Sequence, residues 1–172
     1  SLVGPVGNSP LHAAGVAAAV RDTAGKPIVL CSLGDGMTQQ GESLEGIAHA
    51  ARAGLPVLFL IQDNGLAIST PTKGRTFYDL PGGRAQEFCG IPIEYVDARD
   101  PVKLSGVLEA VVSGMREDRR PRIVVGDVDR LHNHTNADDQ RMYRSAEEIS
   151  RVQQTGDPLL AMRRYLLDAG HT

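Results

Sequence analysis

The sequence predicts an α/β domain in which a doubly wound, mostly parallel sheet carries helices on both faces. Two observations predict this fold class. Short apolar runs alternate with longer helical patterns along the chain, and most of the runs are apolar nearly throughout. Strands buried on both faces of a parallel sheet have continuous apolar sequences, and alternation with helices is typical of right-handed βαβ units. A chain of 172 residues fits one domain, so we expect residues 1–172 to form a single unit.

Four apolar runs are the predicted strands: 28–33, 57–61, 91–96 and 123–128. The first, second and fourth are apolar nearly throughout, so we expect each to be buried on both faces. In a doubly wound sheet, ligands gather at the carboxyl ends of the strands. The residues that follow Leu33, Ile61 and Val128 are therefore the first candidates for a functional site.

Three helices are predicted between these strands, over 10–22, 42–52 and 102–116. The first is rich in Ala and is closed by Gly25 and Pro27. The second is amphipathic and ends at Gly54. The third carries Val, Leu and Met at helical spacing after the breaker Asp100-Pro101. Each predicted helix therefore has a recognisable end or start in the sequence.

The C-terminal segment 145–170 is predicted to form two more helices. Ser145 and Glu148 have the spacing of a capping box, and Asp157-Pro158 is a typical start for the second helix. Two long polar stretches, 64–76 and 130–143, fit neither strands nor helices, and such loops are usually functional or mobile. We expect 130–143 to be a mobile active-site loop, because it has little apolar surface to bury.

Composition excludes several classes of function. The net charge is −3 with both signs spread along the chain, and aromatic residues make up 4%, so neither a nucleic acid nor a membrane surface is expected as a partner. No run reaches the ~20 apolar residues needed to span a bilayer, and the first ten residues do not resemble a signal peptide. We expect a cytoplasmic, bacterial-like location, with the mitochondrial matrix as the alternative.

Two polar turns follow the first two predicted strands. Gly34-Asp35-Gly36 comes after the first, and Asp63-Asn64-Gly65 after the second. Each alone is most often a plain turn. Together they place a carboxylate and an amide oxygen at the ends of neighbouring strands, where a helix N-terminus favours phosphate. Mg²⁺ prefers oxygen ligands of this kind together with the phosphates of its partner. The pair therefore predicts a diphosphate–Mg²⁺ site.

The two turns also carry a family resemblance. The spacing of these turns resembles the signature of thiamine diphosphate enzymes, in which Gly34-Asp35-Gly36 is followed after about thirty residues by Asp63-Asn64. Two longer segments resemble the α subunits of branched-chain 2-oxoacid and pyruvate dehydrogenases more specifically. They are GDGMTQQGESLEGIAHAARAGLPVLFLIQDNGLAISTPT and HNHTNADDQRMYRSAEEI. The resemblance runs from about Gly4 to the C-terminus. It implies the thiamine diphosphate-binding fold and a decarboxylating component that passes an acyl group to lipoamide, with branched-chain 2-oxoacids favoured as substrates.

The resemblance assigns roles to matching residues. It implies three Mg²⁺ ligands: the Asp35 carboxylate, the Asn64 amide and the backbone oxygen of Leu66. Cofactor contacts are implied for eight residues: Gly34, Asp35, Gly36, Met37, Asn64, Leu66, Ile68 and His134. Gly36 and Met37 would lie against the diphosphate, and Ile68 near the middle of the cofactor. His134 matches a histidine that reaches the diphosphate and the reacting substrate, which makes it the predicted catalytic residue.

Some positions depart from the family pattern or remain open. Asp63 stands where the family has asparagine. Gln62 stands where some members carry a diphosphate-binding arginine, so the site loses one positive charge. Thr135 falls where animal members carry a regulatory phosphoserine. From composition alone, His134 could also be a solvated loop histidine. We expect Arg130, Tyr143 and Arg144 to order this loop through hydrogen bonds and ion pairs with Asp138 or Asp139.

The resemblance also implies partners. The family's glutamate that activates the aminopyrimidine has no candidate in this chain, so we expect a pyrimidine-binding domain from a β subunit or from a fused remainder of the chain. A lipoyl-bearing acyltransferase core and a homodimeric or heterotetrameric assembly are also implied, and the isolated chain is expected to be inactive. Two alternatives remain open: another thiamine diphosphate enzyme, such as an acetoin dehydrogenase or transketolase-like protein, or an inactive binding module. A Rossmann-type nucleotide site is disfavoured because no Gly-x-Gly-x-x-Gly follows the first strand.

Overall fold

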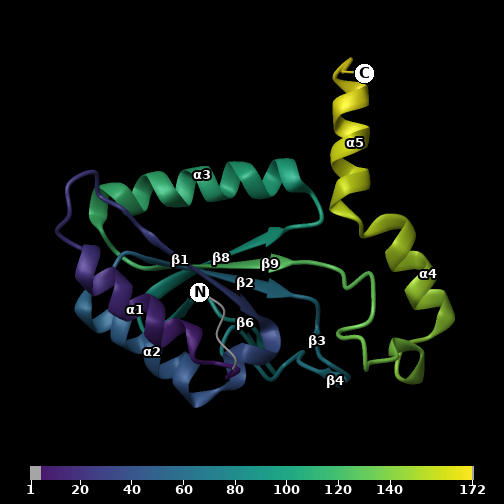
Figure 1. The fold of residues 1–172 in the computed structure, drawn as a ribbon, viewed down its shortest axis with the longest axis horizontal. Coiled ribbons are helices and arrows are strands. Elements are labelled where there is room, and N and C mark those ends of the chain that lie inside the picture. The colour runs from purple at the N-terminus through teal and green to yellow at the C-terminus, as the bar shows by residue number, and fades with distance from the viewer. Residues whose placement is uncertain (1–4, 172) are drawn as a thin grey trace.

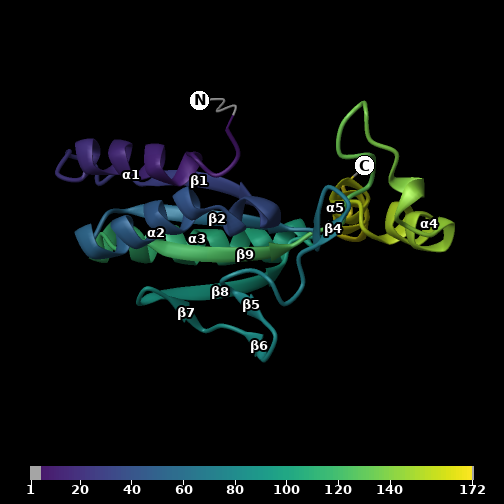
Figure 2. The same ribbon diagram turned by 90° about the horizontal axis from the view of Figure 1, so that it is seen from below.

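The computed structural model describes residues 5–171, so residues 1–4 and 172 of the expected domain lie outside the description. Its centre is a five-stranded sheet in the order β1-β2-β9-β8-β7. Four strands run parallel, β1 (Val29–Gly34), β2 (Val57–Asp63), β9 (Arg122–Asp127) and β8 (Ile91–Asp97). The short β7 (Glu87–Phe88) pairs antiparallel with β8. Figure 2 shows the strands in this order, from β1 beside α1 to β8. The predicted α/β class with a mostly parallel sheet is confirmed.

Helices cover both faces of the sheet, with α1 (Ser9–Val20) and α2 (Gly41–Ala53) on one face and α3 (Pro101–Asp118) on the other (Figure 1). Alternate side chains of β2 divide between the two faces. Phe59 and Ile61 join the cluster formed with α1 and α2, whereas Leu58 joins the cluster formed with α3. This alternation follows from the two-residue period of a strand. Both faces of β2 are therefore core, as its continuous apolar sequence predicts.

Strand β1 contradicts the expectation that it is buried on both faces. Leu33 is buried, but Leu30 is 59% exposed. The reason is its place in the sheet. Within the described residues β1 is an edge strand, and α3 packs over β8 and β9 rather than over β1. An apolar run therefore predicted the strand but not its position in the order.

The two helices predicted at the C-terminus are present as α4 (Ala146–Thr155) and α5 (Pro158–Asp168). The Ser145 hydroxyl accepts a hydrogen bond from the Glu148 backbone at 3.1 Å, and the Asp157 side chain caps α5 at the Leu159 backbone at 2.8 Å. Figure 1 shows α5 projecting away from the sheet. It has no buried residue among those described, so capping rather than core packing defines it. No described helix is both long and apolar enough to cross a bilayer.

The two loops contain more structure than their polar sequences indicate. In the first, β3 (Leu66–Ala67) and β4 (Thr70–Pro71) form a small hairpin, and β5 (Asp79–Leu80) pairs with β6 (Gly83–Arg84) further on. These short strands were not predicted. The second loop contains a single turn of 3-10 helix, η2 (Gln140–Met142). Strand arrowheads in Figure 1 point toward the side of the molecule where both loops lie.

Candidate functional site

Asp35 lies at the carboxyl end of β1, in a buried position. Its exposure is 3%, and the Thr72 hydroxyl donates a hydrogen bond of 2.6 Å to its Oδ2 atom. The backbone carbonyl of Asp35 accepts a bond from the Thr38 hydroxyl, also at 2.6 Å. Among the described residues, no lysine, arginine or histidine forms an ion pair with Asp35. A buried carboxylate usually has a cationic partner, so this one has the chemistry of a ligand for a bound cation.

The helix predicted over 42–52 is confirmed as α2, but a short helical turn that was not predicted separates it from Asp35. Asp35 opens a five-residue 3-10 helix, η1 (Asp35–Gln39), and α2 begins only at Gly41. The backbone amides closest to Asp35 therefore belong to a short turn rather than to a long helix. Such a turn still presents amide groups to an anion, but it lacks the summed dipole of a long helix.

Asn64 lies in a tight turn at the carboxyl end of β2, which is the strand next to β1. Gly34 and Gln62 are paired in the sheet register, so the residues that follow them lie at the same edge. The Asp63 carboxylate accepts a bond of 2.8 Å from the Gly65 backbone, and the Asn64 amide oxygen accepts one of 3.1 Å from the Leu66 backbone. The structure therefore brings the Asp35 and Asn64 segments to one edge, while their role as metal ligands stays a prediction.

Leu66 and Ile68 lie in the β3–β4 hairpin. Leu66 pairs with Pro71, and Ile68 occupies the turn with a φ of 56° and a side chain that is 52% exposed. A positive φ is strained for a β-branched residue and persists only when the surrounding structure holds it. Here the Arg130 guanidinium donates a hydrogen bond of 2.8 Å to the Ile68 carbonyl. The hairpin therefore presents an apolar side chain to solvent on a constrained backbone.

Gly36 and Met37 have packing roles in the structure. A Cβ atom at Gly36 would lie 2.7 Å from the Cβ of Ala67, so only glycine allows η1 to approach β3 this closely. Met37 is partly buried against the cluster shared with α1 and α2. At Gly34, by contrast, an added Cβ would meet no atom within 4 Å, so the end of β1 faces open space. The cofactor contacts of these three residues stay predictions.

His134 lies in the exposed stretch 132–137 of the second loop. Its backbone amide donates to the Asp138 carboxylate at 2.8 Å, and the Tyr143 hydroxyl donates to the same oxygen at 2.6 Å. Arg130 donates to the Tyr143 oxygen at 3.0 Å and to the Ile68 carbonyl. A continuous chain of contacts thus joins the hairpin tip to the His134 segment. Mobility of the loop stays a prediction.

Arg144 orders the loop through partners other than those expected. It pairs with Glu148 at 2.8 Å rather than with Asp138 or Asp139, and it also donates to the Gln140 amide oxygen at 2.6 Å and to the Arg130 carbonyl at 2.8 Å. Arg144 lies just before the N-cap Ser145, so its side chain reaches Glu148 in the first turn of α4. Asp139 pairs instead with Arg141, whose guanidinium lowers the pKa of that carboxyl to about 2.

Negative charge accumulates beside the Asn64 turn. Burial raises the pKa of Asp63, the hydrogen bond from the Gly65 backbone opposes this, and the nearby charge of Asp35 adds to the rise. The Tyr78 hydroxyl donates to Asp63 at 3.1 Å, and burial and the Asp63 charge raise the pKa of that phenol well above its ordinary value. Carboxylates gathered at such a site favour a cation.

Gln62, the expected replacement for a diphosphate-binding arginine, adds no positive charge at this edge. Its amide donates to the Ser32 hydroxyl at 3.1 Å. The described residues contain no cluster of three or more His, Cys, Asp or Glu side chains suited to a metal. A cation at this edge would therefore be held by a mixed set, namely the Asp35 carboxylate, an amide and a backbone oxygen. Such a set fits Mg²⁺, which takes one or two carboxylates and completes its shell with water and phosphate.

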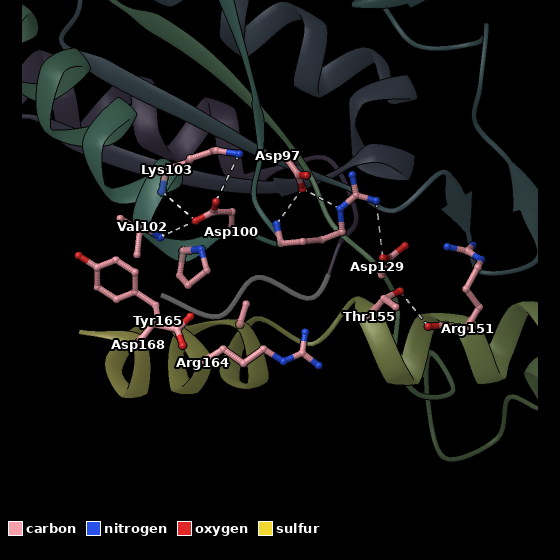
Figure 3. Close-up of a pocket in the computed structure, with 13 residues that line it drawn as sticks. Asp97, Asp100, Val102, Lys103, Asp129, Arg151, Thr155, Arg164, Tyr165 and Asp168 are labelled. Carbon is pink, nitrogen blue, oxygen red and sulfur yellow. Dashed lines mark hydrogen bonds and ion pairs between the residues drawn. The ribbon is translucent and has the colours of Figure 1, made fainter. Parts of the chain in front are cut away.

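Two cavities lie near the carboxyl ends of the strands. One of about 480 Å³ borders the Asp63–Gly65 turn and is lined also by Lys73, Arg84 and Asp127. A larger one of about 570 Å³ lies between the start of α3 and the helices α4 and α5 (Figure 3). Its carboxylates are largely paired already, since Arg99 contacts Asp97 and Asp129. The smaller cavity is the one that adjoins the candidate site.

Sequence reasoning missed Thr72, Tyr78 and Arg84. Thr72 is 1% exposed and bonds to Asp35, Tyr78 bonds to Asp63, and Arg84 pairs with Asp127 at 2.6 Å. All three lie in the polar segment between β2 and β8, where no periodic pattern shows which side chains are buried. The only available signal was the length of that segment, which is typical of functional loops.

Comparisons with known proteins identify the family of the chain. A family model described as the dehydrogenase E1 component matches residues 2–172. The 3-methyl-2-oxobutanoate dehydrogenase subunit alpha of Mycobacterium tuberculosis is 34% identical over 96% of this chain and 45% of that protein. The 2-oxoisovalerate dehydrogenase subunit alpha of Bacillus subtilis is 30% identical over 96% of this chain and 50% of that protein. The chain thus spans half or less of the length of these relatives.

A solved structure shares the fold. It is described as a putative thiamin diphosphate-dependent enzyme from Mycobacterium smegmatis, and it superposes with a TM-score of 0.55 at 23% identity, covering 74% of this chain and 23% of that one. At this identity the likeness concerns the fold alone. The family match, in contrast, extends over nearly the whole sequence, and we conclude that the chain belongs to the dehydrogenase E1 component family, among the relatives of 2-oxoacid dehydrogenase α subunits.

Proposed function

We propose that this chain holds the diphosphate and Mg²⁺ of thiamine diphosphate in the decarboxylating component of a 2-oxoacid dehydrogenase complex. The observation that carries the proposal is the Asp35 carboxylate. It is buried, it has no cationic partner among the described residues, and it lies at the same strand edge as the Asn64 turn. Removing a charge from water without a partner is costly, so a bound cation accounts for this carboxylate best.

The ligand roles follow from the chemistry of each group. Asp35 would supply the charged oxygen, Asn64 the amide oxygen and Leu66 its backbone carbonyl. In the structure the Asn64 oxygen accepts a bond from the Leu66 backbone, so this oxygen would have to exchange or share that bond. Gly34, Gly36 and Met37 would border the diphosphate at the end of β1. When bound, the cofactor would supply the electron sink that decarboxylation needs, and this chain's residues would anchor and orient it.

The remaining residues would act on the reacting end. Ile68 would pack against the middle of the cofactor, since its side chain is exposed at the tip of the constrained hairpin. His134 would donate hydrogen bonds to the diphosphate and exchange a proton with the substrate, because an imidazole ring can act as both a hydrogen-bond donor and a proton carrier. The contacts through Arg130 and Tyr143 would keep His134 close to the hairpin.

A partner domain would complete the site. We propose that a pyrimidine-binding domain, on a β subunit or a fused chain, supplies the glutamate that this chain lacks. A lipoyl-bearing acyltransferase would then accept the acyl group, in a homodimeric or heterotetrameric component located in the cytoplasm. Branched-chain 2-oxoacids are the favoured substrates, because the relatives with 30% identity or more over most of this chain include proteins named for such acids.

Calorimetric titration of thiamine diphosphate with Mg²⁺ into the chain tests the proposal, first alone and then with the β subunit of a bacterial branched-chain dehydrogenase. We expect binding that requires Mg²⁺, tightens with the β subunit and weakens by at least about 100-fold in Asp35→Ala, which loses the charged ligand. Asp22→Ala is the matched control, because the Asp22 side chain is 85% exposed and lies outside the site.

Two results would contradict the proposal. Equal binding by Asp35→Ala and the wild-type chain would exclude Asp35 as a ligand. Absence of any heat, even with the β subunit, would favour the alternative of a domain that acts only as a binding module.

A further inference from the structure

Thr72 connects the two segments that carry the predicted metal ligands. Its hydroxyl donates to Oδ2 of Asp35 at 2.6 Å, and its backbone amide donates to the Gly65 carbonyl at 3.1 Å. Asp35 follows β1, whereas Gly65 lies between Asn64 and Leu66 after β2. Thr72 itself is 1% exposed and follows β4 directly. A single buried residue therefore fixes the position of one strand end relative to the other.

The hydroxyl also decides how Asp35 can bind a cation. It occupies Oδ2, and among the described residues no hydrogen bond is formed to Oδ1. A carboxylate held in this way presents one free oxygen in a fixed direction. Mg²⁺ requires near-ideal octahedral geometry, and a carboxylate bound through one oxygen suits it, whereas Ca²⁺ accepts carboxylates bound through both oxygens.

A hydroxyl suits this task better than a charged donor. A lysine or arginine beside Asp35 would orient the carboxylate but would also neutralise it, and the cation would then be repelled. The threonine hydroxyl orients the group and leaves its negative charge available. The β-branched threonine side chain is restricted at χ1, so its hydroxyl is held in one orientation. The hydrogen bond to Oδ2 therefore limits rotation of the Asp35 carboxylate.

We propose that Thr72 is a positioning residue that holds Asp35 in a one-oxygen geometry and so sets both the affinity and the selectivity of the site for Mg²⁺. The inference rests on the proposed function, because it requires a cation at Asp35. Groups that orient metal ligands typically change metal affinity by about 10- to 100-fold when removed. We expect the loss of the Thr72 hydroxyl to change the affinity for Mg²⁺ within this range.

The test compares Thr72→Val, which keeps the shape and removes the donor, with Thr72→Ser, which keeps the donor. Binding of Mg²⁺ and of Ca²⁺ is titrated calorimetrically in the presence of thiamine diphosphate. We expect Thr72→Val to weaken Mg²⁺ binding by about tenfold or more and to lower the ratio of Mg²⁺ to Ca²⁺ affinity, because Oδ2 becomes free. Thr72→Ser should stay within about threefold of the wild-type chain, since it keeps the charge-assisted hydrogen bond.

Thr76→Val is the matched control. Thr76 is 4% exposed in the same loop, but its hydroxyl accepts a hydrogen bond from the Asp79 backbone at 2.9 Å and does not contact Asp35. This variant should lower thermal stability without changing the ratio of Mg²⁺ to Ca²⁺ affinity. A change in the ratio equal to that of Thr72→Val would show a general effect of the loop and would overturn the inference.

The remaining outcomes are also decisive. If the wild-type chain binds Mg²⁺ and Thr72→Val binds it equally well with the same selectivity, the inference on Thr72 fails while the proposed function stands. If the wild-type chain binds no Mg²⁺ even with the β subunit present, both fail. Should Thr72→Val not fold, Thr72→Cys serves instead, because a thiol of similar size is a weak donor. Its Mg²⁺ affinity should then fall between those of the serine variant and a non-binding chain, and wild-type affinity would overturn the inference.

Discussion

The two loops that follow the neighbouring strands β2 and β9 differ in how they are held. The first loop, residues 64–76, folds into a hairpin and buries Thr72 and Thr76 at 1% and 4% exposure. The second loop, residues 130–143, leaves 132–137 exposed and is held by a few side chains around Arg130 and Arg144. Under the proposed function, this difference would correspond to a division of tasks. A preorganised segment suits a metal and diphosphate, which must be held in one geometry, and a weakly anchored segment suits a reactive histidine.

Among the variants that test this difference between the loops, Arg144→Ala should have the largest effect on stability. The Arg144 side chain is 4% exposed and makes hydrogen bonds to Glu148, Gln140 and the Arg130 carbonyl. Its loss leaves buried acceptors without a donor, so we expect a stability loss of about 2 kcal/mol, concentrated in the second loop and α4. Thermal unfolding with hydrogen exchange would measure it. Arg141→Ala is the control, because that side chain is 81% exposed, and an equal loss there would refute the anchoring role of Arg144.

Asp63→Asn, at the start of the first loop, should change the stability of the fold by an amount that depends on pH. Burial and the Asp35 charge raise the pKa of Asp63 in the folded chain, so the folded state binds a proton more tightly than the unfolded state. Wild-type stability should therefore fall as pH rises from the ordinary carboxyl value through the raised one, and the asparagine variant should lack this fall.

At neutral pH the free energy of unfolding of Asp63→Asn should exceed that of the wild-type chain by less than ~1 kcal/mol, because Asp63 is partly exposed and its charge is screened. Denaturant unfolding in EDTA between pH 3 and pH 7 measures this difference, with Asp22→Asn as the exposed control. A difference that shrinks as pH rises would contradict the assignment of the raised pKa to Asp63.

Tyr143→Phe should have the smallest effect on stability, but it should measurably increase the local opening of the second loop. The hydroxyl links Asp138, at 2.6 Å, to Arg130, at 3.0 Å, in a partly buried part of the loop. We expect global stability to change by less than ~0.5 kcal/mol. Amide exchange at 132–138 should become several-fold faster, because one of the loop's few anchors is lost. Unchanged exchange would show that the remaining contacts suffice to hold the loop.

Sequence reasoning predicted the elements of the fold well and the contents of the loops poorly. The four long strands and five helices were predicted close to their observed positions, because hydrophobic periodicity and capping residues such as Ser145 and Asp157 report local structure. The hairpin around Ile68 was not predicted, since its strands are two residues long and its turn uses a β-branched residue at positive φ. Arg144 was assigned the wrong partner because a pairing within the loop was assumed, whereas its side chain reaches Glu148 in the first turn of α4.

The sequence by itself determined that the chain is a mostly parallel α/β domain and that Asp35 and Asn64 follow successive strands. Both depend on short-range patterns that the strand and helix segments carry in their own sequence. Only the tertiary structure decided that, within residues 5–171, β1 is an edge strand and Asp35 is buried without a cationic partner. It also decided that Thr72, 37 residues away in the sequence, bonds to Asp35. Burial and pairing between distant segments arise from packing in three dimensions, and a polar loop carries no periodic pattern from which packing can be deduced.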